Sequence, residues 1–392
     1  MLQNLALQTP ISISGIASVS ALGISSATIW QRYLDGQALF SKKKIDSNEI
    51  LGAFVSSEGD EALIKLRHSN TSYKNLDRSV LLAMLAAKNS FDSQIFPKKN
   101  IGINIGSSRG ATELFEKYHA QYQKTGKVSP YASPTTTLGN ISSWVGQELG
   151  VNGVQIGHSV TCSTAMHALL NGIAWLQAHM ADAFVVGGSE AALTPFTVAQ
   201  MQALKLYSRG TELSTCESMR FDKKENTMIL GEGAVVAVLE RNTSDRTLAL
   251  VLGYGFASEK LKHNSSISEN ATCFQESMKM ALQNAALISV DVIIMHAPGT
   301  VKGDKAEKNA LDAVFEDELP LLTSNKWLIG HTFGASGMMS LEFAVLMLQH
   351  NTFIENPFFS NTINAPKEMK TIMINAVGFG GNAVSIIVGK AQ

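Results

Sequence analysis

Apolar runs typical of buried strands alternate along this chain with segments of helical periodicity. The clearest strands are 101–106, 183–188 and 290–296, and 183–188 is apolar on both faces, as in a strand at the centre of a sheet. Helical periodicity occurs in six segments: 76–89, 111–123, 139–149, 271–286, 304–315 and 337–350. This alternation predicts a layered α/β structure.

The remaining segments extend this pattern. Further strands are expected at 11–19, 228–240, 248–256, 372–375 and 384–388, with a charged turn at 241–246. Residues 35–72 are polar and weakly patterned, which predicts irregular structure with small helices at most, and 206–226 is expected to be a loop. No linker or low-complexity segment divides the chain, so we expect one fused unit, and no sequence repeat proves a duplication.

Composition narrows the class of protein. The 392 residues support a sizeable core, and 45% hydrophobic against 17% charged residues fits a compact α/β protein. A net charge of −1 argues against broad nucleic-acid binding, although a local basic patch could serve an acidic partner. The three cysteines lack metal-type spacing and cannot all be paired, and the chain shows neither a signal peptide nor an apolar run of bilayer length. These features predict a cytoplasmic protein without a membrane span.

Cys162 is the leading candidate for a nucleophile. It lies between a short β-like run, 154–156, and a helical segment that begins near Met166. A thiol at a helix N-terminus is expected to have a lowered pKa and therefore more of the nucleophilic thiolate. The competing interpretation is a buried cysteine that acts as a small hydrophobic residue.

Two histidines lie in loops that suit chemistry. His296 follows an apolar strand in a Gly/Pro turn, and His331 lies in a small-residue loop before a helix. The glycine-rich loop 378–381 could bring backbone N–H groups close to a ligand, as an oxyanion hole requires. His158 and His167 are near Cys162 in sequence and are possible bases, although neither clearly points at the thiol.

Cofactor and metal sites are weakly supported. A zinc site built from Cys162, His296 and His331 would lack the paired ligand spacing usual for zinc. A dinucleotide fold is weaker still, because no G-x-G-x-x-G follows a first strand. We therefore expect neither a metal nor a cofactor.

Taken together, these stretches resemble the β-ketoacyl-acyl-carrier-protein synthases, condensing enzymes of the Cys-His-His class with a thiolase-like fold. The resemblance runs nearly end to end and preserves the order and spacing of the family's motifs. The matching stretches are Ile13 to Gly23, Leu76-Asp77-Arg78, Val160-Thr161-Cys162-Ser163, Phe221-Asp222 with Gly231-Glu232-Gly233-Ala234, Val290 to His296 with Gly303-Asp304 and Glu307, Lys326 with Gly330-His331, and Gly378-Phe379-Gly380-Gly381.

The resemblance implies a fold and an activity. The fold would be a five-layered α-β-α-β-α arrangement of two pseudo-symmetric halves, residues 1–240 with the nucleophile and 241–392 with the two histidines. The activity would be decarboxylative Claisen condensation of malonyl-acyl carrier protein with a cysteine-bound acyl chain, in fatty-acid or polyene/polyketide-type biosynthesis. The implied partners are acyl carrier proteins that deliver the acyl and malonyl groups.

It also implies residue roles. Cys162 would carry the acyl group, while His296 and His331 would stabilise the enolate formed as CO₂ leaves. The N–H groups of Cys162 and Phe379 would form the oxyanion hole, with Phe379 also a gate over the acyl pocket. Lys326 would support the site, and Asp304 and Glu307 would form a structural acidic pair.

Three departures from the family pattern bear on function. The loop after His296 contains Ala297-Pro298, the segment after Asp222 lacks the family's arginine, and the glutamate expected to pair with Lys326 is Ser340, with Glu342 two positions later. A chain-length-factor-like partner subunit of an active ketosynthase is therefore the alternative, although the retained Cys162 favours the enzyme.

The resemblance finally implies a dimer, with a second copy or with a related ketosynthase. In the family the dimer forms through the strand that follows the nucleophile helix, which here is residues 183–188, and an open apolar edge there would otherwise invite aggregation. The altered loops lead us to expect a related synthase as the partner.

Overall fold

The computed structural model describes residues 7–45, 47–96, 100–138, 140–210, 216–260, 267–316 and 318–391. Residues 1–6, and residues 211–215 of the expected loop, lie outside this set. Ten strands of the described chain form one mixed sheet in the order β10-β9-β11-β12-β8-β1-β7-β6-β4-β5. These strands are β1 (Ile11–Ser20), β4 (Ile101–Gly106), β5 (Gln155–Ile156), β6 (Ala183–Glu190), β7 (Gly233–Arg241), β8 (Ala249–Ser258), β9 (Val292–Ile294), β10 (Leu321–Thr323), β11 (Thr371–Gly378) and β12 (Asn382–Lys390).

The strand order reveals a repeat that the residues alone did not show. From the edge inward, the first half runs β5-β4-β6-β7-β1 and the second runs β10-β9-β11-β12-β8. In each half, the two outer pairings are parallel and the next one is antiparallel. In the first half β4 pairs in parallel with β5 and β6, and β6 pairs antiparallel with β7. In the second half β9 pairs in parallel with β10 and β11, and β11 pairs antiparallel with β12. The halves join where β1 pairs with β8 over three residue pairs.

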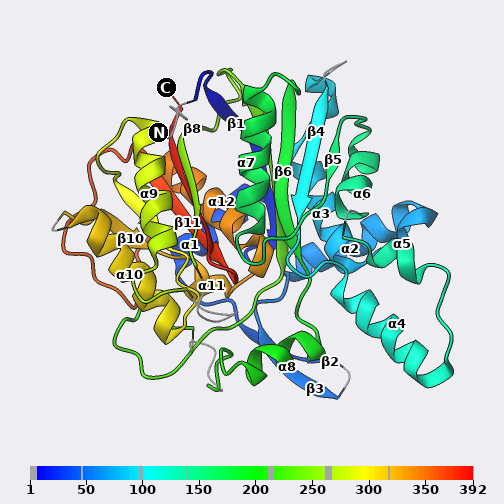
Figure 1. Ribbon diagram of the computed structural model, residues 1–392. Helices are drawn as coiled ribbons and strands as arrows, with labels where there is room; N and C mark the ends of the chain where they lie inside the picture. The colour runs from blue at the N-terminus through cyan, green and yellow to red at the C-terminus, as the bar shows by residue number, and fades with distance from the viewer. Residues whose placement is uncertain are drawn as a thin grey trace.

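Helices cover this sheet and separate its halves (Figure 1). α3 and α6 pack on the outer face of the first half, α9 and α10 on the outer face of the second, and α7 and α12 lie between the halves. The chain therefore has the five predicted layers. The helices are α1 (Ser26–Asp35), α2 (Ser57–Ser69), α3 (Arg78–Ser90), α4 (Thr112–Thr125), α5 (Ala132–Thr136), α6 (Asn140–Leu149), α7 (Thr164–Gln177), α8 (Pro195–Ala203), α9 (Thr272–Ala285), α10 (Val301–Phe315), α11 (Lys326–Ile329) and α12 (Ser336–His350), with short 3₁₀ turns at Thr71–Tyr73, Ser93–Ile95 and Phe333–Ala335.

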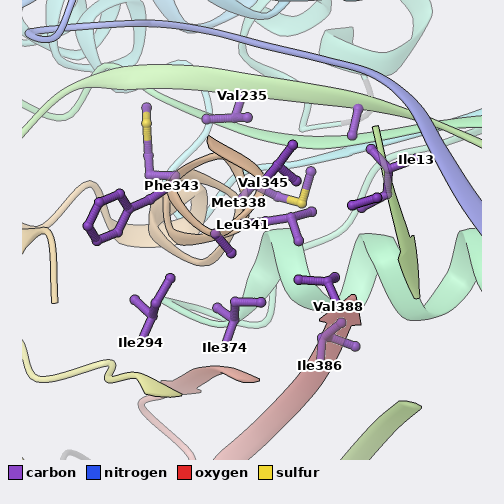
Figure 2. Close-up of a cluster of buried hydrophobic side chains, with 14 of the residues drawn as sticks. Ile13, Val235, Ile294, Met338, Leu341, Phe343, Val345, Ile374, Ile386 and Val388 are labelled. Carbon is purple, nitrogen blue, oxygen red and sulfur yellow. The ribbon is translucent and has the colours of Figure 1, made fainter. Parts of the chain in front are cut away.

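The central helix α12 is predominantly apolar because it is enclosed on all sides. Every residue from 320 to 348 is buried. Figure 2 shows Met338, Leu341 and Val345 of this helix between Val235 of the first half and Ile374 of the second. Packing against both sheets holds the two halves in one hydrophobic core, in agreement with the expected fused unit.

Two expectations about local structure are wrong. The polar stretch 35–72 contains the 13-residue helix α2 and a hairpin of β2 (Ser41–Ile45) with β3 (Asn48–Gly52). The helix was hard to recognise because it buries only Gly59, Leu63 and Leu66. It is capped by the Ser56 side chain, which accepts a hydrogen bond from Gly59 N.

The strand proposed for dimerisation has no free edge. β6 pairs along its length with β4 on one side and β7 on the other, so its apolar character reflects a central position within this chain. The strand at the edge of the first half is the short β5, which precedes the cysteine turn. Within the described residues, none of the helices combines the length and apolarity needed to cross a bilayer.

Candidate active site

Cys162 lies in a strained turn between β5 and α7. Thr161 has a φ of 48°, in the left-handed region that side chains disfavour, and α7 begins two residues after the cysteine. The turn is stabilised by the Thr164 hydroxyl, which accepts from Val160 N at 2.9 Å, and by Ser163 Oγ, which donates to Val160 O at 3.0 Å. Such strain at a buried turn fixes the position of the thiol.

The expected lowering of the thiol pKa is wrong for the free protein. Burial raises the pKa of Cys162 to about 12, and the nearby Glu190 carboxyl adds to the increase. The positive charges of Lys326 and Arg109 act in the opposite direction but do not offset the burial. The resting site therefore holds a neutral thiol, because desolvation outweighs the helix terminus.

His296 is held through its backbone. Strand β9 ends two residues earlier, and the Glu307 carboxylate on α10 accepts from His296 N at 2.9 Å and from Ala297 N at 2.8 Å. Asn375 Nδ2 donates to the same carboxylate at 3.3 Å. Glu307 therefore ties the loop to α10 and leaves the imidazole free to face the site.

Asp304 fixes the next part of this loop. Its carboxylate accepts from Gly299 N at 3.0 Å and Thr300 N at 3.1 Å. It also forms a buried ion pair with Lys223, at 2.7 Å. Lys223 belongs to the segment after Asp222 that departs from the family pattern, so this segment still supports the histidine loop.

His331 comes from the second half, after α11. Its N–H donates to Ile229 O at 2.7 Å and its carbonyl accepts from Gly231 N at 3.1 Å, which joins it to the first half. The His331 and His296 rings are 5.2 Å apart at their centroids and nearly perpendicular, at 89°. The Nδ1 atoms of both are buried without a hydrogen-bond partner among the described residues.

Both imidazoles are neutral at physiological pH. Burial, with the charge of Lys326, lowers the pKa of His331 to about 3, and burial also lowers the pKa of His296 well below its ordinary value. A neutral imidazole donates through one nitrogen only. The pair can thus donate hydrogen bonds to a developing negative charge, but it is not a source of positive charge.

Lys326 is buried in the same region and is not ion-paired with any described carboxylate. Burial lowers the pKa of its ammonium group to about 8, while the charges of Glu307 and Asp304 oppose that change. Ser340, which stands where the family has a glutamate, contacts Asn325 Oδ1 at 3.5 Å. Glu342 does not replace the missing partner, because it forms no ion pair with Lys326, and its buried Oε2 has no hydrogen-bond partner among the described residues.

The glycine-rich loop between β11 and β12 lies against the cysteine turn. A Cβ on Gly378 would come within 1.9 Å of Thr161 Oγ1 and 3.2 Å of Cys162 N, so only glycine allows this approach. The carbonyl of Phe379 accepts from Thr161 Oγ1 at 3.1 Å. The N–H groups of Cys162 and Phe379 are therefore brought into the same neighbourhood.

Two cavities meet at Cys162. The larger, about 710 Å³, contains Cys162, His296, His331 and Phe379 in its walls. The smaller, about 420 Å³, also reaches Cys162 and Phe379 but neither histidine. The structure thus brings the predicted cysteine, both histidines and Phe379 together, with Lys326, Asp304 and Glu307 packed around them.

The other histidines near the cysteine are not bases. His158 contacts Asn104 Nδ2 at 2.9 Å and Thr164 O at 3.1 Å, so both ring nitrogens are occupied. His167 Nδ1 bonds with Ser163 O at 3.0 Å within its own helix. In the described ranges, no group of three or more His, Cys, Asp or Glu side chains is placed to hold a metal ion.

Two residues escaped sequence reasoning. Glu190, at the end of β6, is buried beside the thiol, and burial raises the pKa of its carboxyl to about 8. Its Oε1 accepts from Ser108 N and from Gly334 N, while Oε2 has no partner among the described residues. Arg109 follows β4 and lines the smaller cavity. In the sequence, only the position of Glu190 and Arg109 near the end of a predicted strand could have indicated that they belong to the site.

Comparison with known proteins agrees with this site. The family model described as beta-ketoacyl synthase, N-terminal domain, matches residues 8–244, and the C-terminal domain of the same family matches 248–359. A 3-oxoacyl-[acyl-carrier-protein] synthase 2 of Coxiella burnetii is 26% identical over 97% of this chain and 98% of its own length. A protein of the same name from Staphylococcus aureus is 25% identical over 97% of this chain and 98% of its own length.

Solved structures show the same fold. A β-ketoacyl synthase from Burkholderia phymatum has a TM-score of 0.83 at 20% identity and covers 98% of this chain and 100% of that chain. A ketosynthase in complex with its chain length factor from Xenorhabdus doucetiae has a TM-score of 0.80 at 21% identity and covers 98% of each. The thiolase-like fold class is confirmed.

The chain belongs to the β-ketoacyl synthase family. It is an acyl-transferring condensing enzyme, as the sequence predicted.

Proposed function

We propose that this chain is the nucleophile-bearing ketosynthase that joins a Cys162-bound acyl group to malonyl-acyl carrier protein with loss of CO₂. The observation that carries the proposal is that Cys162, His296 and His331, which lie far apart in sequence, line one cavity. The two neutral histidines provide N–H donors at buried positions, where such donors stabilise developing charge more strongly than in water.

The first step is acyl transfer. The Cys162 sulfur attacks the thioester carbon of the acyl-carrier protein, a C–S bond forms, and the carrier thiol leaves with the proton from the cysteine. The N–H groups of Cys162 and Phe379 stabilise the tetrahedral oxyanion. Because the resting thiol is neutral, its proton leaves only as the substrate binds, and the charges of Lys326 and Arg109 favour that loss.

The second step is condensation. His296 and His331 donate hydrogen bonds to the thioester carbonyl of malonyl-carrier protein while its terminal C–C bond breaks. The electron pair of that bond forms the enolate, and CO₂ leaves. The enolate carbon then attacks the Cys162 thioester, the C–S bond to the enzyme breaks, and the thiolate takes up a proton.

Charge at the larger cavity supports an acidic carrier partner. Its lining includes four cations, Lys205, Arg209, Lys224 and Lys302, and one carboxylate, Glu225. This local excess exists although the whole chain has a net charge of −1. Such a patch attracts an acidic protein and a phosphate-bearing prosthetic arm.

A dimer is part of this proposal. The edge strand β5 and the projecting helix α4, which buries none of its residues, are the surfaces of the first half that would suit a second chain (Figure 1). Phe115 and Tyr122 of α4 are exposed, at 62% and 51%. Lys326 forms no ion pair with a carboxylate of the described residues, which keeps a related synthase as the expected partner, and the ketosynthase–chain length factor neighbours have that arrangement.

Location and domain boundaries complete the proposal. Cys162, Cys216 and Cys273 are all free, which fits the reducing cytoplasm. The division at residues 240 and 241 stays a prediction, supported by the end of β7 at Arg241 and the start of the second strand set at Ala249.

Intact-protein mass spectrometry tests the activity. Incubation with hexanoyl-carrier protein is expected to add one hexanoyl group per chain, mapped to Cys162 by peptide digestion. Addition of malonyl-carrier protein should then release it as 3-oxooctanoyl-carrier protein. The proposal would be contradicted if Cys162 is never acylated, or if malonyl-carrier protein does not release the acyl group. Co-expression with related synthases then tests whether a partner chain restores the activity.

A further inference from the structure

The smaller cavity at Cys162 has mainly apolar walls that also carry a few hydrogen-bonding groups, which an acyl chain must accommodate. It is lined by residues of the loop after β4, helix α4 and helix α8, and neither His296 nor His331 lines it. Its lining combines aromatic rings with hydrogen-bonding groups: Ser108, Arg109, Thr112, Phe115, Glu116, Thr161, Cys162, Phe196, Thr197, Gln200, Phe333 and Phe379.

Arg109 is held at this cavity without a carboxylate partner among the described residues. Its guanidinium donates to Gln200 Oε1 and lies 5.3 Å from the centre of the Phe333 ring. Its charge acts on the Cys162 thiol. The preceding residue, Ser108, is fixed by its N–H bond to Glu190, so the loop that carries Arg109 is anchored.

The bond to Gln200 determines which groups remain for a ligand. The amide oxygen of Gln200 accepts from Arg109, so the two N–H donors on Gln200 Nε2 remain available to a ligand. The other N–H groups of the Arg109 guanidinium remain available as well. A purely hydrocarbon chain would displace water from these donors without replacing its hydrogen bonds, which costs free energy. An acceptor oxygen on the chain would replace them.

The charges in the cavity favour a neutral acceptor. Arg109 is the one cation and Glu116 the one carboxylate among the groups that line it, and Glu116 accepts a hydrogen bond from Thr194. A second carboxylate would therefore meet repulsion from Glu116 as well as attraction from Arg109. A ketone oxygen meets the donors without that repulsion.

We propose that the smaller cavity holds the acyl group on Cys162, and that Arg109 with Gln200 selects acyl chains that carry a neutral acceptor oxygen such as a ketone. This inference rests on the proposed function, because it assigns a substrate class to the same cysteine. Arg109 is then a specificity-determining residue, and the histidine-lined cavity is left for the malonyl group.

Three acyl groups of nearly equal shape test the selection. 5-Oxohexanoyl, 5-methylhexanoyl and glutaryl groups differ only in whether the fifth carbon bears one oxygen, none or two. Each is offered on the same carrier protein, and the rate of Cys162 acylation is followed by intact-protein mass spectrometry. We expect the oxo group to react about tenfold faster than the methyl group, as one hydrogen bond to a charged donor allows.

Variants link the preference to its residues. Arg109→Met should remove the preference for the oxo group or reverse it, Arg109→Lys should keep part of it, and Gln200→Met should reduce it by a smaller factor. Arg209→Met, a cation of the other cavity, should leave the ratio between acyl groups unchanged. An oxo-to-methyl ratio that is the same in the parent and in a folded Arg109→Met protein would overturn the proposal, as would a preference for glutaryl in the parent.

A binding measurement separates this inference from the proposed function. The same three acyl groups joined to aminopantetheine through an amide cannot acylate a thiol, and their Kd values are measured by calorimetry on the parent and Arg109→Met proteins. One outcome is that no carrier protein acylates Cys162, while the oxo amide still binds about tenfold more tightly than the methyl amide and this difference depends on Arg109. That outcome would contradict the proposed function and retain the inference. Acylation without any preference in either assay would retain the function and overturn the inference.

Discussion

The two halves of the molecule share one strand order but contribute different chemistry. The ends of β4, β5 and β6 lead to Arg109, Cys162 and Glu190, and the ends of their counterparts β9, β10 and β11 lead to His296, His331 and Phe379. Six matching strand ends therefore surround one site. The first half supplies the thiol with Arg109 and Glu190, whereas the second supplies two neutral imidazoles, the charge of Lys326 and a glycine-rich turn.

The difference shows how a repeated scaffold can be specialised. In the first half the cysteine is followed directly by α7, whose surface is only partly buried. In the second half the stretch from 320 to 348, with His331 and all of α12 up to Leu348, is enclosed. Burial keeps both imidazoles neutral and also keeps the Cys162 thiol neutral, so none of these three reacting groups is charged in the resting site.

Removal of the first half's nucleophile should have the largest effect. Cys162→Ala is expected to abolish acyl-enzyme formation, lowering condensation by at least about a thousandfold, because the covalent intermediate cannot form. Cys216→Ala and Cys273→Ala remove equally buried thiols away from the turn and should retain acylation. Mass spectrometry and product formation measure both. Condensation that continues in the Cys162 variant would assign the chemistry to a partner chain.

Changes to the second half should separate the two steps. His296→Ala and His331→Ala are each expected to lower decarboxylation of malonyl-carrier protein by roughly 10²- to 10³-fold, as the loss of one oxyanion donor does in other enzymes. Acylation of Cys162 should change much less. Release of ¹⁴CO₂ and acyl-enzyme formation are measured in parallel. Equal loss of both steps would show that the division of labour between the halves is wrong.

Loss of the carboxylate that holds the His296 loop should have an intermediate effect. Glu307→Ala leaves the N–H groups of His296 and Ala297 unsatisfied in a buried region, which is expected to cost about 1–3 kcal/mol of stability and to lower decarboxylation more than acylation. Urea unfolding and the two activity assays measure these changes. Glu307→Gln, which retains one acceptor oxygen, should recover part of the loss; the absence of any difference between the variants would remove the loop from the mechanism.

A pH effect should be the smallest. In the folded chain Glu190 keeps its proton up to about pH 8, whereas the unfolded carboxyl loses it near 4.5, so the folded state binds more protons between these values. Its contribution to the free energy of unfolding therefore falls as pH rises from about 4.5 to 8. Glu190→Gln should make Tm less dependent on pH in that window. The exposed Glu113→Gln should follow the parent, and identical slopes for all three proteins would contradict the burial argument.

Much of the fold was accessible from sequence because its buried elements have strong patterns. β6 is apolar from Ala183 to Gly188, α12 is predominantly apolar, and α10 and α9 show clear helical periodicity. α2 was missed because a helix that buries so few residues has too little periodic signal. The edge position given to 183–188 was wrong because apolarity reports burial, and neighbouring strands of the same chain bury a strand as well as a partner does.

The site was predictable where a residue type matches a chemical role in a recognisable turn. Cys162, His296 and His331 were singled out in this way, whereas Phe379 came only from the family resemblance. Glu190 and Arg109 were not, because an acidic or basic residue after a strand has no distinctive local pattern. The direction of the Cys162 pKa change was also missed, since it depends on how deeply the thiol is buried and sequence alone does not give that depth.

The enclosure of α12 has a consequence for how the molecule is made. Strand β1 pairs with β7, beginning with Ile11 opposite Arg241, so this pairing forms only after β7 has been synthesised. The helix between the sheets packs against strands from both ends of the chain. Contacts so distant in sequence slow folding. We therefore expect the core between the two sheets to close only after α12 has been synthesised, and a fragment that ends before α12 to leave part of the apolar inner face of the first sheet uncovered and prone to aggregation.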